Sequence, residues 1–376
     1  MPSRRAFTLY AAALLPCARL AQADTGPILI GASLPLSGTN AAVGNEGLAV
    51  LQAYCDSVNR NGGVDGRPLQ LTALDDAFVP AKAAENARTL AAGKAVALVN
   101  CWGTASCSAM VPVVTQTGLP LVGGIAGGGA MRAAPARQVF NIRASTAAEI
   151  GAMVRHMTSI GQQRIAVVYQ DDAFGKGGLE VAQQVLRERG LQPVLQQALA
   201  ADGANAAAVA QALAREPAPN GIILLASPPA TVALIPQARK AGLRAQFYNL
   251  AAQASDSVVQ GLGEHTTGVV FTTLVPSPWR TSVPAVRDYQ QLLTAMDRPP
   301  RPSYLGLEVY LNARVLVDGL RKAGRTVQRE SLIQALESME TRQYGAMAVR
   351  FGPQQQHEGS SYVGLAMIDR RGQFIE

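Results

Sequence analysis

Short runs of consecutive apolar residues alternate along most of the chain with longer segments in which apolar residues recur every three or four positions. The runs predict buried strands, and the periodic segments predict helices with one face packed on a core. Strands are predicted at 28–34, 69–74, 95–99, 119–122, 164–169, 192–196, 221–225, 246–250 and 268–274. This alternation favours an α/β fold, in which helices cover both faces of a parallel sheet.

The alternation is interrupted twice, which indicates two lobes. A short extended segment at 140–143 precedes Thr146-Ala-Ala-Glu149, which has the pattern of a capping box and opens a second strand–helix series. After residue 277 the pattern predicts helices at 284–296, 305–323 and about 329–339 with no strand between them, and extended segments at 347–351 and 362–368.

These late helices have no sheet of their own, so they must pack on one that is already built. We therefore expect one lobe to comprise residues 24–144 and 277–345, and the other to comprise residues 145–276 and 346–376. The chain would then cross between the lobes three times, at 144–145, 276–278 and 344–346.

Residues 1–23 have the pattern of a signal peptide. Arg4 and Arg5 precede a mostly apolar stretch at 6–18, and Ala21-Gln22-Ala23 fits a cleavage site of small residues. The arginine pair also fits the twin-arginine route, and the sequence leaves that route and the general secretory route open. Pro16 directly before Cys17 disfavours lipid attachment at that cysteine. We expect a protein of the periplasm.

Composition and motifs argue against several classes of protein. Of the 376 residues 48% are hydrophobic, and no run reaches the roughly 18 apolar residues of a membrane span. Loss of the signal peptide removes three arginines and no acid, which lowers the formal net charge from +7 to +4 without leaving a basic run. Nucleic acid is therefore not an expected partner. The three histidines lie far apart, and neither a nucleophile-elbow nor a phosphate-loop motif occurs. We expect no enzyme, no metal site and no cofactor.

Three cysteines remain after the signal peptide, and in an oxidising compartment an odd number leaves at least one thiol free. Cys101 and Cys107 are close in sequence, which favours a disulfide between them. Cys55 lies on a predicted helical face beside Leu51 and Val58, so we expect it to be a buried thiol.

Two loops of small and polar residues follow neighbouring predicted strands. Gly103-Thr-Ala-Ser106 follows the strand at 95–99, and the glycine-dense segment 123–129 follows the strand at 119–122. In a parallel sheet both loops leave the carboxyl edge, where ligands bind. Helix starts offer unpaired N–H groups, and glycines allow a close approach to the backbone. Either loop alone is also an ordinary turn, but together they predict a cleft that binds a carboxylate.

Several segments resemble the leucine/isoleucine/valine-binding family, the periplasmic solute-binding proteins that feed ABC transporters. They are Ile30-Gly-Ala-Ser-Leu-Pro-Leu-Ser-Gly38, Asn59-Arg-Asn-Gly-Gly-Val-Asp-Gly66, Asp75-Asp76, Tyr169-Gln-Asp-Asp-Ala-Phe-Gly175 and Gln237-Ala-Arg-Lys-Ala-Gly-Leu243. The resemblance covers essentially the whole mature chain. It implies a type I periplasmic-binding-protein fold, with two doubly wound parallel-sheet lobes joined by a three-segment hinge.

The resemblance also implies a partner and a mode of action. A small-molecule ligand would be bound by hinge closure and delivered to the membrane permease of an ABC transporter, and we expect a monomer. A ligand-sensing subunit of the same fold, serving a signalling partner, is the alternative.

Site residues follow from the resemblance one by one. In the family the ligand's carboxylate is held by loops that match Gly103-Thr104-Ala105 and Ala126-Gly127-Gly128. Thr104 keeps a hydroxyl, whereas the second loop has none. Phe174 matches an aromatic residue of the other lobe that covers the ligand. The family's ammonium-binding acid falls at about Ala251 and its assisting tyrosine near Ser227, so both of these side chains are lost.

A disulfide common in the family is also missing, because Phe78 and Gly103 occupy its positions, and Cys101–Cys107 is the expected replacement. The lost acid predicts a carboxylate ligand without a conventionally bound α-ammonium group, such as a keto acid, an aromatic acid or another small organic acid. An ammonium buried there without a counter-charge would cost several kcal/mol. The alternative is a shifted site in which Asp171, Asp172 or Glu308 supplies the charge.

Overall fold

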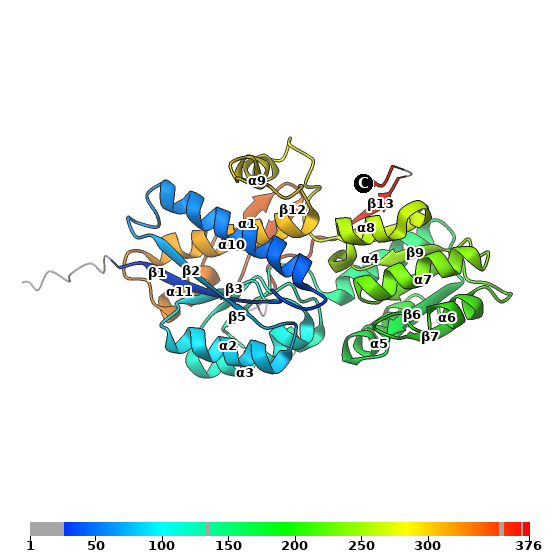
Figure 1. Cartoon of the computed structure of the whole chain (residues 1–376). Coiled ribbons are helices and arrows are strands. Elements are labelled where there is room, and N and C mark those ends of the chain that lie inside the picture. The colour runs from blue at the N-terminus through cyan, green and yellow to red at the C-terminus, as the bar shows by residue number, and fades with distance from the viewer. Residues whose placement is uncertain (1–25, 133–135, 353–356, 370) are drawn as a thin grey trace, which may run out of the picture.

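The computed structural model describes residues 26–132, 136–352, 357–369 and 371–376, which form two α/β lobes side by side (Figure 1). The predicted signal peptide, with Cys17, lies outside the described residues. In the first lobe the sheet order is β2-β1-β3-β4-β5, and all neighbouring strands are parallel. Its strands are β1 (Ile28–Leu34), β2 (Leu69–Asp75), β3 (Ala97–Val99), β4 (Leu121–Val122) and β5 (Val139–Phe140).

The helices of the first lobe come from both ends of the chain. They are α1 (Ala41–Arg60), α2 (Pro80–Ala92), α3 (Thr104–Thr117), η1 (Gly129–Met131), α9 (Pro284–Thr294), α10 (Tyr304–Ala323) and α11 (Arg329–Glu337). The helix α10 is buried on nearly all sides and packs against α1 and α11. A helix that is apolar around most of its circumference belongs in a core, which is why α10 lies inside the lobe.

The second lobe contains a seven-stranded sheet in the order β14-β13-β10-β9-β8-β6-β7. Its strands are β6 (Ile165–Gln170), β7 (Leu195–Leu199), β8 (Gly221–Leu225), β9 (Gln246–Asn249), β10 (Val269–Thr273), β13 (Gly364–Ile368) and β14 (Phe374–Ile375). Its helices are α4 (Thr146–Ser159), α5 (Ala173–Arg187), α6 (Ala206–Leu213), α7 (Pro228–Lys240), η2 (Ala251–Gln253), α8 (Asp256–Leu262) and η3 (Gly263–Thr266). Because β13 runs antiparallel to β10 and β14 antiparallel to β13, this sheet is mixed and not wholly parallel as predicted.

The chain passes from the first sheet to the second between β5 and α4, and it returns after β10, since α9 packs against α1. The later return to the second sheet differs from the expected boundary at residue 346. Strands β11 (Arg342–Tyr344) and β12 (Met347–Val349) form a hairpin, and the ring of Phe351 packs edge-on against Phe140 at 5.1 Å. The chain therefore stays with the first lobe until it approaches β13. What looked like a crossing near Gly345 is the turn of this hairpin.

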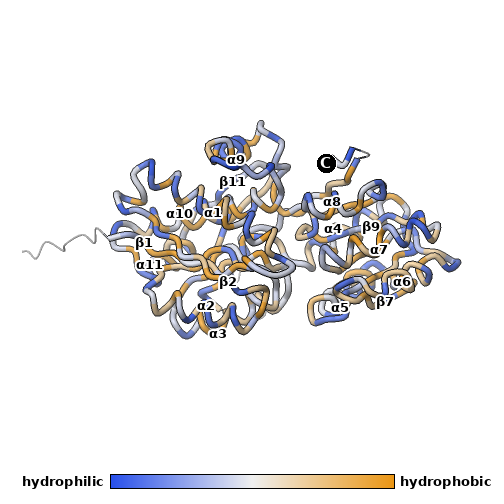
Figure 2. The backbone as a smooth tube through the Cα atoms, in the orientation of Figure 1, coloured by the Kyte–Doolittle hydropathy of each residue, from blue (hydrophilic) through white to orange (hydrophobic). Residues whose placement is uncertain are grey.

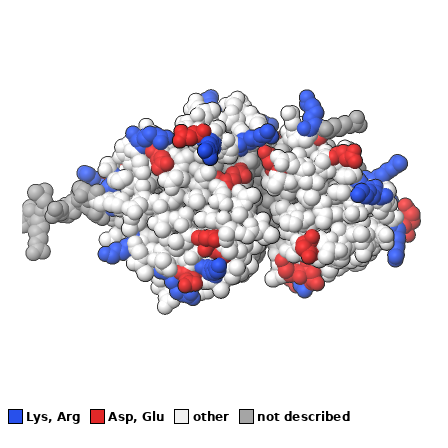
Figure 3. All heavy atoms as spheres, viewed as in Figure 1, with Lys and Arg blue, Asp and Glu red and all other residues white. Residues whose placement is uncertain are grey.

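Hydrophobic positions follow the strands and the inward sides of the helices, and hydrophilic positions lie on the outer turns (Figure 2). No helix in the described ranges has the length and apolar character needed to cross a membrane. Basic and acidic side chains are interspersed over both lobes on the face shown in Figure 3.

Candidate functional site

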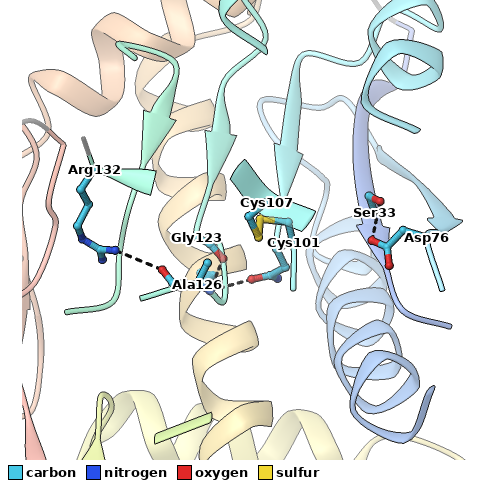
Figure 4. The surroundings of a disulfide bond; sticks show 9 residues. Ser33, Asp76, Cys101, Cys107, Gly123, Ala126 and Arg132 are labelled. Atoms are coloured by element: carbon cyan, nitrogen blue, oxygen red, sulfur yellow. Dashed lines mark hydrogen bonds between the residues drawn. A yellow bond between two sulfur atoms is a disulfide. The ribbon is translucent and has the colours of Figure 1, made fainter. Parts of the chain in front are cut away.

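The two loops singled out in the sequence are joined to one another by backbone hydrogen bonds. The N–H of Ile125 donates to the carbonyl of Cys101 at 2.8 Å, and the N–H of Gly103 donates to the carbonyl of Ile125 at 3.1 Å. Cys101 and Cys107 form a disulfide, which lies against the second loop, because a Cβ placed on Gly124 would be 3.0 Å from Sγ of Cys101 (Figure 4). The loops therefore form one connected edge at the ends of β3 and β4.

Thr104 and Gly128 meet across this edge. Gly103, with φ of +79°, is the N-cap of α3, so Thr104 is the first residue of that helix and the exposed Ala105 the second. A Cβ on Gly128 would overlap the Thr104 side chain, with Thr104 Oγ1 at 2.8 Å. The hydroxyl, the start of α3 and a backbone without a side chain thus lie together.

The helix α10 fixes this edge from below. Asn312 Nδ2 donates to Asn100 Oδ1 at 2.7 Å and to the carbonyl of Gly123 at 2.9 Å, which ties the ends of β3 and β4 to one buried side chain. In Figure 4 a long helix passes behind Gly123 at this point. The position of both loops is therefore coupled to α10.

The second loop also contacts the hinge. Arg132 donates from Nη1 to the carbonyl of Ala126 at 3.3 Å (Figure 4) and from Nη2 to the carbonyl of Arg143 at 2.8 Å, and its Nε lies 3.1 Å from Glu358 Oε1. The carbonyl of Gly127 accepts from the N–H of Thr146, the first residue of α4 in the second lobe, at 2.8 Å. A shift of the lobes would move the loop through these contacts.

In the second lobe, the side chains of Phe174 and Ser227 both make contacts within that lobe. Phe174 is half-buried at the start of α5 and packs against the core of its own lobe, although α5 and α3 touch across the interface. The N–H of Ser227 donates to Gln170 Oε1 at 2.9 Å, and its hydroxyl donates to the carbonyl of Ala201 at 3.1 Å. The Ser227 side chain is thus hydrogen-bonded within its own lobe, whereas Phe174 lies at the start of the helix that touches α3.

Ala251 is half-buried and has a carboxylate beside it from another element. Its N–H donates to Glu149 Oε2 at 2.8 Å, and the hydroxyl of Thr272 donates to the same oxygen. The interpretation of Thr146–Glu149 as a capping box is wrong, because Ser145 is the N-cap of α4 and accepts from the N–H of Ala148. Glu149 lies one turn into the helix, and its carboxylate reaches η2 instead of the helix end.

Between the lobes lies a small cavity of about 20 Å³, which is room for about one water molecule. It is lined from the first lobe by Val43, Trp102, Ile125, Tyr304, Leu305 and Glu308, and from the second lobe and its connection by Ala251, Ala252, Ala254, Ser255, Leu274 and Val275. Trp102 and Tyr304 were not among the predicted ligand-binding residues, and Glu308 was considered only as the acid of a shifted site. The signal that could have revealed Glu308 is a single acid within the longest buried stretch of α10.

Glu308 lines this cavity and faces Arg143. Its Oε1 lies 3.1 Å from Arg143 Nε, and both side chains are more than nine-tenths buried. Burial raises the pKa of the Glu308 carboxyl, Arg143 opposes that rise, and the charge of Glu149 adds to it. Glu149, Arg143 and Glu308 therefore form one buried charge cluster beside the cavity.

The other two acids considered in the sequence are engaged elsewhere. Asp171 is exposed and pairs with Lys176 at 2.8 Å. Asp172 is the N-cap of α5 and accepts from the N–H of Gly175 at 2.9 Å. Within the described residues, no group of three or more His, Cys, Asp or Glu side chains is arranged to hold a metal ion.

Residues 27–373 match the family described as "Periplasmic binding protein", which is nearly the whole described chain. The chain belongs to the periplasmic binding protein family. The fold agrees: an extracellular ligand-binding receptor from Verminephrobacter eiseniae is 27% identical with a TM-score of 0.86, covering 93% of this chain and 100% of that one. A substrate-binding periplasmic protein from Ralstonia solanacearum is 28% identical with a TM-score of 0.84, covering 93% and 99%.

A third relative is the Leu/Ile/Val-binding protein BraC3 of Rhizobium johnstonii, which is 25% identical over 358 residues and 89% of each chain. The predicted resemblance to the leucine/isoleucine/valine-binding family and the predicted type I fold are confirmed. As a periplasmic binding protein the chain is a solute-binding protein for ABC transport and not an enzyme.

Proposed function

We propose that this periplasmic binding protein captures a small carboxylate-bearing ligand between its lobes, in the periplasm, and delivers it to the membrane permease of an ABC transporter. The observation that carries the proposal is the contact between Thr104 and Gly128. It joins a hydroxyl donor, the N–H groups that begin the fourteen-residue helix α3, and a glycine backbone, in the two loops whose residues Trp102 and Ile125 line the interlobe cavity. Such an arrangement suits an anion held by short hydrogen bonds.

The neighbourhood supports a small and partly apolar ligand. Trp102, Ile125 and Leu274 contribute apolar surface to the interlobe cavity. BraC3 of Rhizobium johnstonii is named for leucine, isoleucine and valine, which are carboxylates with apolar side chains. Because the cavity holds about 20 Å³, a ligand of several heavy atoms requires the lobes to separate and then to close around it.

A thermal-shift panel of small carboxylates tests the proposal. A ligand at 100 times its dissociation constant stabilises a protein by about 2.7 kcal/mol, which is readily measured. The panel comprises branched-chain and aromatic amino acids, the keto and hydroxy acids of the same carbon skeletons, and an uncharged amide of each acid as the control. We expect a carboxylate to raise the melting temperature and its amide to have no effect.

Thr104→Ala should weaken binding of that carboxylate roughly tenfold or more, since a hydrogen bond to a charged group is lost, whereas Thr104→Ser should retain it. Equal stabilisation by acids and amides, or unchanged binding by Thr104→Ala, would contradict the proposal.

A further inference from the structure

Glu308 occupies a position from which it can contact a bound ligand directly. It lies on α10 one turn before Asn312, which ties the ends of β3 and β4, and it lines the interlobe cavity together with Trp102 and Ile125. Ala251, where the resemblance places a missing acid, lines the same cavity from the other lobe. The cavity is therefore lined by the acid Glu308 from the first lobe and, from the second lobe, by Ala251, at the position where the resemblance implies that an acid has been lost.

Arg143, the ion-pair partner of Glu308, does not fill the hydrogen-bonding capacity of the Glu308 carboxylate. Glu308 Oε1 and Arg143 Nε are 3.1 Å apart, yet both are buried polar atoms without a hydrogen-bond partner among the described residues, so the pair is not aligned for a hydrogen bond. Buried polar atoms are normally hydrogen-bonded, and an exception calls for an explanation. A ligand group that enters the cavity and donates hydrogen bonds to Glu308 would explain why this carboxylate oxygen has no hydrogen-bond partner here.

The charges around the cavity do not balance. Glu149 and Glu308 bring two buried carboxylates, one from each lobe, and Arg143 brings one guanidinium. The nearby guanidinium of Arg132 is engaged by Glu358 and by two backbone carbonyls. Glu149 is held by the N–H of Ala251 and the hydroxyl of Thr272, which are neutral donors. One negative charge is left without a matching cation, and an unpaired charge is costly in a buried site.

We infer that Glu308 is the specificity-determining acid of the cleft and binds a positively charged nitrogen of the ligand, with the buried carboxylate of Glu149 adding negative charge nearby. The inference rests on the proposed function and narrows it, because the carboxylate at Thr104 and Gly128 and the cation at Glu308 then belong to one zwitterionic ligand. The structure thus favours the shifted site considered in the sequence over a ligand without an ammonium group. Asp171 and Asp172 do not bind the ligand's cation in this arrangement, because Asp171 pairs with Lys176 and Asp172 caps α5.

The test is isothermal titration with ligand pairs that differ only in the amine. Suitable pairs are leucine with 4-methylpentanoate, phenylalanine with 3-phenylpropanoate, and 4-aminobutanoate with butanoate. In a pair that binds, we expect the wild type to prefer the amine-bearing member by roughly tenfold to a hundredfold, the range of charge-assisted hydrogen bonds. Glu308→Gln should reduce that preference to about threefold or less, because it removes the charge and keeps the shape.

Glu330→Gln is the control, since Glu330 pairs with Arg137 on the surface and does not line the cavity. It should leave the preference unchanged. The inference is overturned if the amine-free member binds the wild type equally well, a comparison that needs no variant to fold. It is also overturned if folded Glu308→Gln, checked by circular dichroism, keeps the full preference. If neither member of any pair binds, the proposed carboxylate function fails, and the inference fails with it.

Discussion

The ring of Phe78 lies directly against the backbone of Gly103, and these are the two positions at which the family resemblance implies a missing disulfide. A Cβ added to Gly103 would be 2.5 Å from Cε2 of Phe78. Phe78 has a φ of +61° and Ala77 a φ of +48°, which is a conformation that residues with side chains rarely adopt. The contact packs an aromatic ring against the residue that precedes Thr104.

Gly103→Ala should therefore be more damaging than an ordinary glycine replacement. It combines an unfavourable φ of +79° with a clash against Phe78, and we expect a loss of about 2–3 kcal/mol in the free energy of unfolding together with weaker ligand binding. Gly118→Ala is the control, since Gly118 has a φ of +65° with open space around its Cα. Denaturant unfolding of both variants measures the difference. Equal losses would show that the Phe78 contact has no role.

The Cys101–Cys107 disulfide should be the covalent brace of the first site loop. The two cysteines are six residues apart, and a closed loop of that size contributes roughly 2–3 kcal/mol to stability. The double variant Cys101→Ser/Cys107→Ser should lose about that amount, whereas Cys55→Ala should leave the bridge intact. Mass spectrometry of the unreduced exported protein should find one free thiol, at the buried Cys55. Free thiols at Cys101 and Cys107 would contradict the prediction.

Asp75 should make part of the stability depend on acid pH. Its carboxylate accepts from the N–H groups of Leu36, Ser37 and Ala77 and from the hydroxyl of Ser37. These hydrogen bonds, with that of the Ser37 hydroxyl the largest, lower the pKa of Asp75 to about 2. Because the unfolded pKa is about 3.9, the stabilisation is complete above roughly pH 4 and is lost as the pH falls toward 2.

The measurement is the free energy of unfolding of wild type and Asp75→Asn between pH 7 and pH 2. Asp75 is exposed, so solvent screening limits the expected difference at pH 7 to about 1 kcal/mol, and this difference should vanish toward pH 2. Asp297→Asn, at an exposed bend, is the control and should show no such convergence. A difference between wild type and Asp75→Asn that stays constant with pH would contradict the assignment.

Much of the fold could be predicted from local patterns. The strands and helices of both lobes produce the runs and periods that the sequence displays, and Gly118, in the left-handed conformation, ends α3 where the pattern placed its end. Local patterns could not predict that β13 is antiparallel, or that the β11–β12 hairpin and Phe351 still belong to the first lobe. Both features depend on pairing between distant segments, such as Phe351 with Phe140 and β13 with β10.

The site likewise combines residues that a local pattern reveals with residues that only the tertiary fold brings together. The loop at Gly103 and Thr104 is encoded by consecutive residues, and a strand–turn–helix pattern reveals it. Glu308 carries only a weak local signal, as the single acid in the buried stretch of α10, and Glu149 carries none. Each lies within a helix, and only tertiary packing brings the two acids close to Arg143. Glu149 even fits a local alternative, the capping box, whose role Ser145 takes in the structure.

Small-angle X-ray scattering, with and without the carboxylate that gives the largest thermal shift, tests the central claim that the lobes close on such a ligand. With saturating ligand, the profile should match that calculated from the present structure, in which the interlobe cavity is about 20 Å³. Without ligand the radius of gyration should be larger, and Thr104→Ala at the same ligand concentration should stay closer to the ligand-free profile. A radius of gyration that does not change between the ligand-free and the saturated wild type would contradict the account.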